Sequence, residues 1–235
     1  MPFILAFAFV AYGQRVTITK QTLSYRRPNP NSPEKARIVV SYPRIRSTNR
    51  ALSRRIKRNI SFERIFNLDL KSEINGRDQW LESAWFEVDY NKKRILSVTL
   101  SMSGSGHFSS TISRSVVVDL KTGRAVKAGD VFDNMDGLAK LVFKYQQAEI
   151  KQAMIDIPKM EGYADFDSGR WFGDMTINIL NLQEFSVSDD GVTFKFDYGF
   201  PRIMLPAQPP GVFLIKWQEL KPFISRRGLL GKLVY

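Results

Sequence analysis

The chain has 235 residues, of which 43% are hydrophobic and 12% aromatic, enough apolar material to bury the core of one domain. It has no cysteine, so a disulfide framework, a thiolate metal site and a cysteine nucleophile are all excluded. Its 35 Lys and Arg residues against 23 Asp and Glu give a net charge of +12, which attracts polyanions such as nucleic acid, acidic lipid headgroups or anionic wall polymers.

The first segment is an apolar run over residues 2–12 that ends in Ala11, Tyr12 and Gly13. It is too short to cross a bilayer, which takes a helix of about 20 residues. Small residues occupy the two positions that a signal peptidase reads, and a cut before Gln14 would fit. A basic segment before the run is missing, so either residues 1–13 are a signal-peptide remnant with the true start upstream, or the run is a buried first strand. We expect export.

Two strands are predicted next, at residues 14–24 and 36–42, separated by a polar, Pro-rich loop. Pro43 is expected to end the second strand. A helix is then predicted with Ser47 or Thr48 as its N-cap, running to Asn59 or as far as Leu70. Its buried face would carry Leu52, Ile56 and Ile60, and its opposite face Arg46, Arg50, Arg54 and Arg58.

An Arg every four residues has two interpretations. One helix face could present guanidinium groups to a row of phosphates, or the stripe could be an ordinary solvated face. No recognition-helix motif or aromatic interleaving accompanies Arg50, Arg54 and Arg58. We therefore favour the solvated face, and next a wall polymer or anionic membrane surface as ligand; a nucleic-acid partner is not expected.

The centre of the chain predicts a β-hairpin. After a strand at residues 85–89, apolar and polar residues alternate along 95–102, and a second strand ends in Val116–Asp119. We expect glycines in the turns because glycine tolerates positive φ. The predicted structural turn residues are Gly104, Gly106, His107, Gly123 and Gly191.

The remaining elements are a helix, a hairpin and a last strand. Apolar residues recur at helical intervals over 135–157, and Pro158 is expected to stop that helix. A loop follows at 160–175. The later elements are strands at 185–187 and 192–197 joined by a Ser-Asp-Asp-Gly turn, a strand at 212–217 and a short helix at 218–224.

Three segments resemble one known family. Gly-Ser-Gly-His at 104–107 is similar to a Gly-Gly-Ala-His turn, and residues 116–132 and 185–220 resemble the middle and closing segments of the extracytoplasmic domain shared by RsiV-type anti-sigma factors and PdaC-type peptidoglycan deacetylases. The resemblance covers residues 35–225. It departs at Ser105, where a second Gly is usual, and no deacetylase domain is present. It implies an α+β fold, a structural role for the turn histidine, and a lysozyme-like envelope partner, which the RsiV-type relative binds as a sensor. The membrane span such a sensor needs is not found in this sequence.

His107 is the only histidine, so any histidine-based catalysis must use it. Ser109, Ser110 and Ser113 lie close in sequence and could complete a nucleophile site. No Gly-x-Ser-x-Gly elbow, His-Glu-x-x-His motif or second ligand histidine supports that interpretation. We favour a structural turn residue and predict no catalytic residue.

Four acids lie within a short loop: Glu161, Asp165, Asp167 and Asp174. They invite a calcium interpretation, but their spacing does not match an EF-hand loop, and no Glu follows Gly169 at the required position. A solvated acidic loop is favoured, and no metal or cofactor is predicted.

The Pro-rich loop at 198–211 is the strongest candidate for recognition. Prolines stiffen a loop and reduce the entropy lost on docking, although the loop could equally be a structural crossing over the core. The candidate ligand-binding residues are Phe200, Pro201, Met204 and Pro209, together with Arg50, Arg54 and Arg58 of the basic stripe.

The sequence thus predicts a single α+β domain at residues 14–235, an antiparallel sheet packed against two main helices. We expect a non-catalytic extracytoplasmic binding module for an envelope protein or an anionic wall polymer. A basic protein such as lysozyme would be repelled by the charge of +12. The alternatives are a wall-glycan hydrolase acting through His107 and a polyanion binder acting through the Arg stripe.

Overall fold

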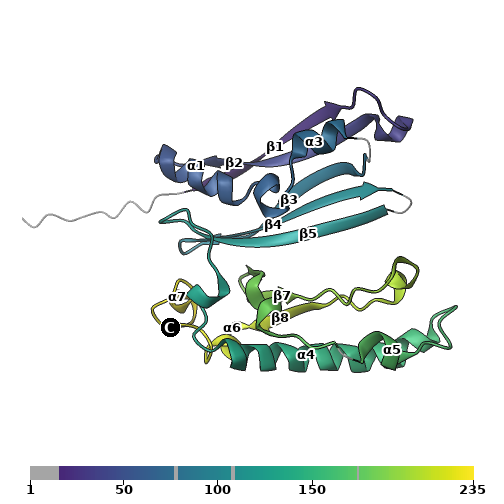
Figure 1. The fold of residues 1–235 in the computed structure, drawn as a ribbon. Coiled ribbons are helices and arrows are strands. Elements are labelled where there is room, and N and C mark those ends of the chain that lie inside the picture. The colour runs from purple at the N-terminus through teal and green to yellow at the C-terminus, as the bar shows by residue number, and fades with distance from the viewer. Residues whose placement is uncertain (1–15, 77–78, 107–108, 174) are drawn as a thin grey trace, which may run out of the picture.

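The computed structural model describes residues 16–76, 79–106, 109–173 and 175–235 (Figure 1). The expected mixture of α and β structure is confirmed, but the strands form two sheets, with the order β1-β2-β3-β4-β5 in the first and β6-β7-β8 in the second. The predicted signal-peptide remnant at residues 1–13 lies outside the described residues.

The first sheet is antiparallel except where β2 runs parallel to β3. The parallel pair arises because three helices connect β2 to β3. The strands are β1 (Thr17–Arg26), β2 (Arg37–Arg46), β3 (Leu81–Lys92), β4 (Ile95–Ser105) and β5 (Ser109–Asp119). The helices are α1 (Arg50–Asn59), α2 (Phe62–Ile65) and α3 (Leu70–Asn75).

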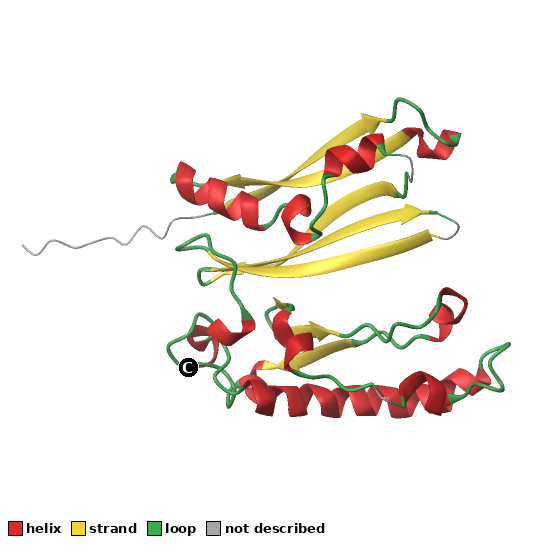
Figure 2. Ribbon diagram, in the orientation of Figure 1, coloured by secondary structure: helices red, strands yellow, loops and turns green. Residues whose placement is uncertain are grey.

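The three helices cover one face of the five-stranded sheet (Figure 2). Leu96, Val98, Leu100 and Met102 of β4 are all buried against this layer, as the alternation along the strand predicted. The buried face of α1 contributes Leu52 and Ile56 to the same core. The alternation in the sequence matches the fold here because every second residue of β4 faces the helices.

The opposite face of this sheet is rich in hydroxyl groups, and it is called the polar face below. The hydroxyl oxygens of Thr99 and Ser115 lie 3.0 Å apart, and those of Ser101 and Ser113 lie 2.8 Å apart. In each pair one hydroxyl donates to the other and links the two strands across this face. Polar side chains of this kind can face solvent, so this part of the face needs no apolar cover.

A second layer packs on one end of the polar face. The small sheet lies between the large sheet and the long helix α4 (Figure 1). Tyr90, Ile95 and Val117 of the large sheet share a core with its buried side chains. The layer comprises β6 (Phe185–Val187), β7 (Gly191–Lys195), β8 (Val212–Lys216), α4 (Met135–Asp156), α6 (Trp217–Leu220) and α7 (Gly231–Val234).

A third, smaller core lies near the C-terminal end of α4. It joins Ile150 and Ile157 to Phe172 of α5 (Ser168–Phe172) and to Tyr198 and Phe200 of the Pro-rich loop. The short 3-10 helices are η1 (Pro33–Ala36), η2 (Ala128–Asp130), η3 (Ile157–Lys159), η4 (Ile179–Gln183) and η5 (Arg202–Ala207). The described part of the chain contains no helix long and apolar enough to cross a membrane.

A hydrogen-bond relay fastens the second layer to the first. The Val187 N–H donates to the Ser97 hydroxyl at 3.0 Å, and Ser97 in turn donates to Asp89 at 3.1 Å. Burial raises the pKa of the Asp89 carboxyl, while hydroxyl donors from Thr99 and Ser97 favour its ionised form. Ser97 is fully buried, so solvent cannot easily replace its hydroxyl as the acceptor for the Val187 N–H.

Two expected boundaries are wrong. β2 continues through Pro43 to Arg46, because it pairs with β3 only at Val39 and Val40 and has one neighbour beyond them, where a missing N–H is tolerated. Asn49, rather than Ser47 or Thr48, caps α1 by accepting from the Leu52 N–H at 3.0 Å. The helix ends at Asn59, the nearer of its two expected ends.

The turn glycines also need a different explanation. Gly123 has a φ of +69°, as a turn requires. Gly104, however, lies inside β4, where a Cβ would come within 1.9 Å of the Trp80 carbonyl oxygen. A Cβ on Gly106 would meet nothing within 4 Å. Close backbone approach, not positive φ, is what Gly104 provides.

Gly191 follows the same rule as Gly104. It begins β7, and a Cβ there would come within 2.0 Å of the Ile215 carbonyl oxygen on β8. The hairpin turn that the sequence predicted before it is present, with the Ser188 N–H bonded to the Gly191 carbonyl. The residue is needed because the two strands approach closely.

Candidate functional site

A groove of about 810 Å³ lies beside the open end of the polar face. Four segments line it: residues 111–114 of β5, residues 180–184 at η4, residues 195–197 after β7, and residues 205–210 of the Pro-rich loop. Three of these segments belong to the second layer and one to the large sheet. The groove is therefore bounded by both layers.

The lining combines amide, charged and apolar side chains. Its amides are Asn181, Gln183 and Gln208; its charged residues are Arg114, Glu184, Lys195 and Asp197; its apolar ones are Ile112, Leu180, Phe196, Leu205 and Pro210. Polar and charged residues outnumber apolar ones among the lining residues, nine to five, so the groove is more polar than the mostly apolar pockets that bind small molecules. The groove is the candidate binding site.

Both carboxylates of the groove are held by neighbours. Glu184 accepts the Ser115 N–H at 2.7 Å and forms an ion pair with Arg114 at 3.6 Å. Asp197 accepts the Gly199 N–H at 2.8 Å. These contacts orient the two carboxylates and leave the Arg114 guanidinium largely exposed toward solvent.

Large apolar side chains are exposed at and beside the groove. Ile112 is 44% exposed, Leu205 45%, Leu180 79% and, next to them on η5, Ile203 83%. Exposed apolar residues gathered at one place mark an interaction surface more than scattered ones do. The sequence did not single these four out; the signal available was the pair Ile203 and Leu205 within a stiff loop.

The structure separates the four loop residues that the sequence proposed. Phe200 and Pro209 are buried, and Phe200 packs in the third core between Trp171 and Phe172. Pro201 is exposed, and Met204 is half-buried over the cavity at residues 162–171. Phe200 and Pro209 thus support the loop from inside, while the exposed contact surface is provided by neighbouring residues.

The three stripe arginines lie on the other side of the large sheet. Arg50, Arg54 and Arg58 are all exposed on α1, whose opposite face packs on the sheet. In the described part of the chain, none of the ion pairs involves α1. They form a basic surface that is separate from the groove.

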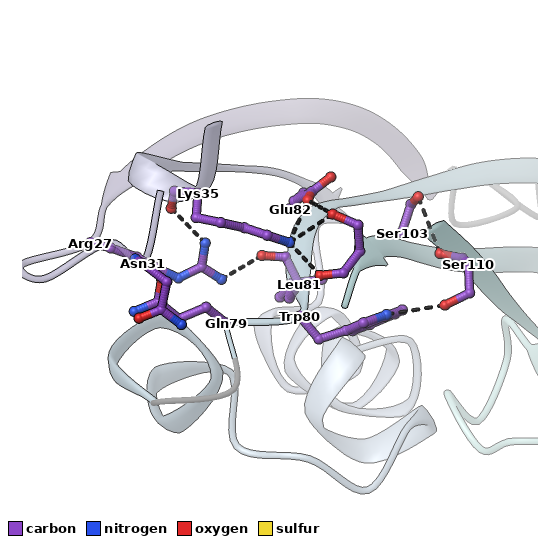
Figure 3. A network of polar contacts seen from close by, with 10 residues as sticks. Arg27, Asn31, Lys35, Gln79, Trp80, Leu81, Glu82, Ser103 and Ser110 are labelled. Atoms are coloured by element: carbon purple, nitrogen blue, oxygen red, sulfur yellow. Dashed lines mark hydrogen bonds and ion pairs between the residues drawn. The ribbon is translucent and has the colours of Figure 1, made fainter. Parts of the chain in front are cut away.

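A polar network lies at the end of the large sheet where β1 and β4 end and β3 begins (Figure 3). Arg27 is 2% exposed and donates to the carbonyls of Lys35 and Leu81, at 2.7 and 2.5 Å. Lys35 bonds Glu82 at 2.5 Å and the Ser105 hydroxyl at 2.8 Å. The network holds residues 27–35, which lie between β1 and β2, against β3 and β4.

The chemistry of this network is structural. Ser105 donates to Glu82, and the hydrogen bonds from Lys35 and Ser105 lower the pKa of the Glu82 carboxyl. Lys35 donates to both Glu82 and Ser105, and the Ser105 hydroxyl donates to Glu82 rather than to Lys35. A serine–lysine pair for hydrolysis would need the opposite arrangement.

His107 lies outside the described residues, as does Asp174. The geometric test of a hydrolase centred on His107 therefore stays open, and the turn role of His107 stays a prediction. Asp167 caps α5 by accepting the Arg170 N–H at 3.2 Å. Among the described residues, no group of three or more His, Cys, Asp or Glu side chains could hold a metal ion.

Two crystal structures share this fold. One is a DUF3298 family member from Bacteroides fragilis, with a TM-score of 0.54 and 15% identity, matching 94% of this chain and 97% of its own. The other is a DUF3298 family protein from Pseudomonas aeruginosa, with a TM-score of 0.50 and 15% identity over 90% of this chain and 95% of its own. No family model and no curated protein matches the chain. At this identity the likeness defines the fold class and not the activity.

Proposed function

We propose that this protein is a non-catalytic extracytoplasmic binding module that recognises a protein of the cell envelope through the groove. The observation that carries the proposal is the meeting of the polar face, η4 and the Pro-rich loop around one groove with an exposed apolar rim. The fold shared with DUF3298 proteins is compatible with such a module. The resemblance of residues 104–107, 116–132 and 185–220 to the RsiV/PdaC-type domain supports an extracytoplasmic setting.

A protein ligand fits the groove better than a wall glycan does. Exposed Leu180 and Leu205 offer the apolar area that a protein interface buries, whereas Phe196 is the one aromatic ring among the described lining residues on which a sugar could stack. The charge of +12 favours an acidic partner over a basic one such as lysozyme.

The test compares capture by the wild type with capture by two leucine variants. Leu205→Asp places a charge on the groove wall, and Leu214→Asp makes the same change on β8 at a leucine of similar exposure, 39%, that does not line the groove. Envelope proteins of the source organism should be retained by the wild type and by Leu214→Asp but not by Leu205→Asp. Capture that is equal for both variants, or retention of the wild type on purified peptidoglycan alone, would contradict the proposal.

The basic surface of α1 supports a second candidate, the binding of an anionic polymer. α1 carries Arg50, Arg54, Arg55, Lys57 and Arg58 and no acidic residue. Affinity for heparin as a probe should fall steeply with salt and should drop when Arg50, Arg54 and Arg58 are changed together to Glu. Binding that is flat between about 50 and 200 mM salt would exclude it.

A further inference from the structure

β5 is an edge strand with two different halves. It is the last strand of the five-stranded sheet, so one of its backbone edges has no strand beside it. Several outward groups of its second half are bonded: Ser115 N–H to Glu184, the Val117 carbonyl to the Val126 N–H, and Asp119 N–H to the Arg124 carbonyl. Because successive residues alternate in direction, the N–H and C=O groups of Ser109, Thr111 and Ser113 point to the same outer edge.

The first half of β5 lacks such caps. In the part of the chain that the structure describes, no hydrogen-bond partner is found at the outer edge for the backbone of Thr111 or Ser113. The pairing of β5 with β4 runs without a register shift from Asp119 to Ser109, so no bulge twists this edge away. Natural sheets protect long regular edges with prolines, bulges or charged side chains; this half has no proline and no bulge, and Arg114 is its one charged residue.

The groove runs beside this uncapped half. Thr111, Ile112, Ser113 and Arg114 form one wall, and the Pro-rich loop forms another. Five strand residues span about 17 Å at roughly 3.3 Å per residue, the length of a short extended peptide. The apolar rim residues could receive alternate side chains of a strand added there.

Charge selects the occupant. The groove lining itself is balanced, with Arg114 and Lys195 against Glu184 and Asp197, so the selection comes from the net charge of the whole chain, +12. Two copies of the protein repel each other, which disfavours pairing of two β5 edges, whereas an acidic segment is attracted. We infer that the uncapped half of β5 takes up an extended, acidic segment of a partner protein as a sixth strand of the sheet; this inference rests on the proposed function of the groove.

The probe is a synthetic seven-residue peptide that alternates Val and Glu, with a fully N-methylated version as its control. Ser113→Pro removes the outward N–H and the Ser113 hydroxyl, and Ser113→Ala removes only the hydroxyl. Ser113→Pro should weaken binding about tenfold, the effect of one lost hydrogen bond of roughly 1.4 kcal/mol, and Ser113→Ala less than about threefold. Amide exchange at Thr111 and Ser113 should slow when the peptide binds, while the β4-paired amides of Ile112 and Arg114 confirm the fold of each variant.

Three results would overturn strand addition. The first is the absence of saturable peptide binding. The second is an affinity of Ser113→Pro for the peptide equal to that of the wild type, and the third is an affinity of the wild type for the N-methylated peptide equal to that for the unmethylated one. A dimer of the free protein that Ser113→Pro dissociates would also overturn it, because the occupant would then be a second copy. If the peptide does not bind while Leu205→Asp still abolishes capture of an envelope protein, strand addition is wrong and the proposed function of the groove stands.

Discussion

The two ends of the polar face use the same strands for opposite purposes. At the covered end, Ile95 and Val117 project from β4 and β5 into the core shared with the small sheet. At the groove end, the same side of these strands carries Ser101 and Ser113, whose hydroxyls pair with each other. The second layer packs over Ile95, Val117 and the buried Ser97 between them, and the groove begins where Ser113 lies.

The edge of β5 repeats the same division. In its covered half the outward amides of Ser115 and Asp119 are bonded to Glu184 and Arg124, and its groove half has backbone groups available to a ligand. An unprotected sheet edge can pair with other chains and so lowers the solubility of a protein. A half-protected edge next to a groove is therefore a place where a function is expected. Stability and recognition are separated along a single strand.

The largest expected effect comes from breaking the covered end. Ile95→Ala removes a fully buried side chain between the two layers and should lower the free energy of unfolding by about 4 kcal/mol. Ile112→Ala makes the same change at the groove end, where the side chain is exposed, and should cost under about 1 kcal/mol. Urea unfolding of both variants measures the difference. Equal losses would mean that the two ends do not differ as described.

Next in size is the close approach at Gly104. Gly104→Ala should cost about 3 kcal/mol, because the added Cβ meets the Trp80 carbonyl oxygen and backbone atoms cannot move aside cheaply. Gly106→Ala, which meets nothing, is the matched control and should be close to neutral. Thermal melts decide the matter; a Gly106 variant that melts lower than the Gly104 variant would refute this placement of the chain.

The relay between the layers should have an intermediate effect. Ser97→Ala leaves the Val187 N–H buried without its partner and should cost about 2 kcal/mol. Ser103→Ala, on the same strand and the same face, breaks only weaker contacts near solvent and should cost less than about 0.5 kcal/mol. Chemical denaturation compares the two, and a neutral Ser97→Ala would show that the relay does not hold the layers together.

The smallest effect concerns the polar network and depends on pH. The folded-state pKa of Glu82 lies below its ordinary value of 4.5, so its contribution is present above about pH 4.5 and is lost as the pH falls through the folded pKa. Glu82→Gln should therefore cost about 1 kcal/mol at pH 7, since the group is partly exposed, and progressively less in acid. Glu87→Gln, an exposed site on the same strand, is the control. A difference between wild type and Glu82→Gln that grows below pH 4 would reverse the sign of this assignment.

The sequence predicted the elements well where local patterns determine them. Alternation located β4, helical periodicity located α4 within one residue at its C-terminal end, and the turn before Gly191 was found. The pairing of β2 with β3 and the division into two sheets could not be predicted, because they depend on contacts between residues far apart in the chain. The glycine at 104 was found for the wrong reason: its neighbour, the Trp80 carbonyl, is distant in sequence.

The candidate site was predicted less well. The Pro-rich loop was singled out, but two of its four proposed residues, Phe200 and Pro209, are buried. The sequence pattern shows which residues are apolar but not which of them are buried in a core. The exposed Ile203 and Leu205 therefore could not be distinguished from the buried Phe200. The wall formed by β5 was missed because a strand edge becomes a site only when the sheet order is known.

Amide hydrogen exchange along β5 of the free protein tests most directly the claim that this edge is capped in one half and available in the other. The outward amides of Ser115 and Asp119 are bonded to Glu184 and Arg124 and should be protected. The outward amides of Thr111 and Ser113 should exchange at least about tenfold faster than these, while Ile112 and Arg114, bonded to β4, stay protected. Protection of Thr111 and Ser113 equal to that of Ser115 would contradict the account, because the edge beside the groove would already be occupied.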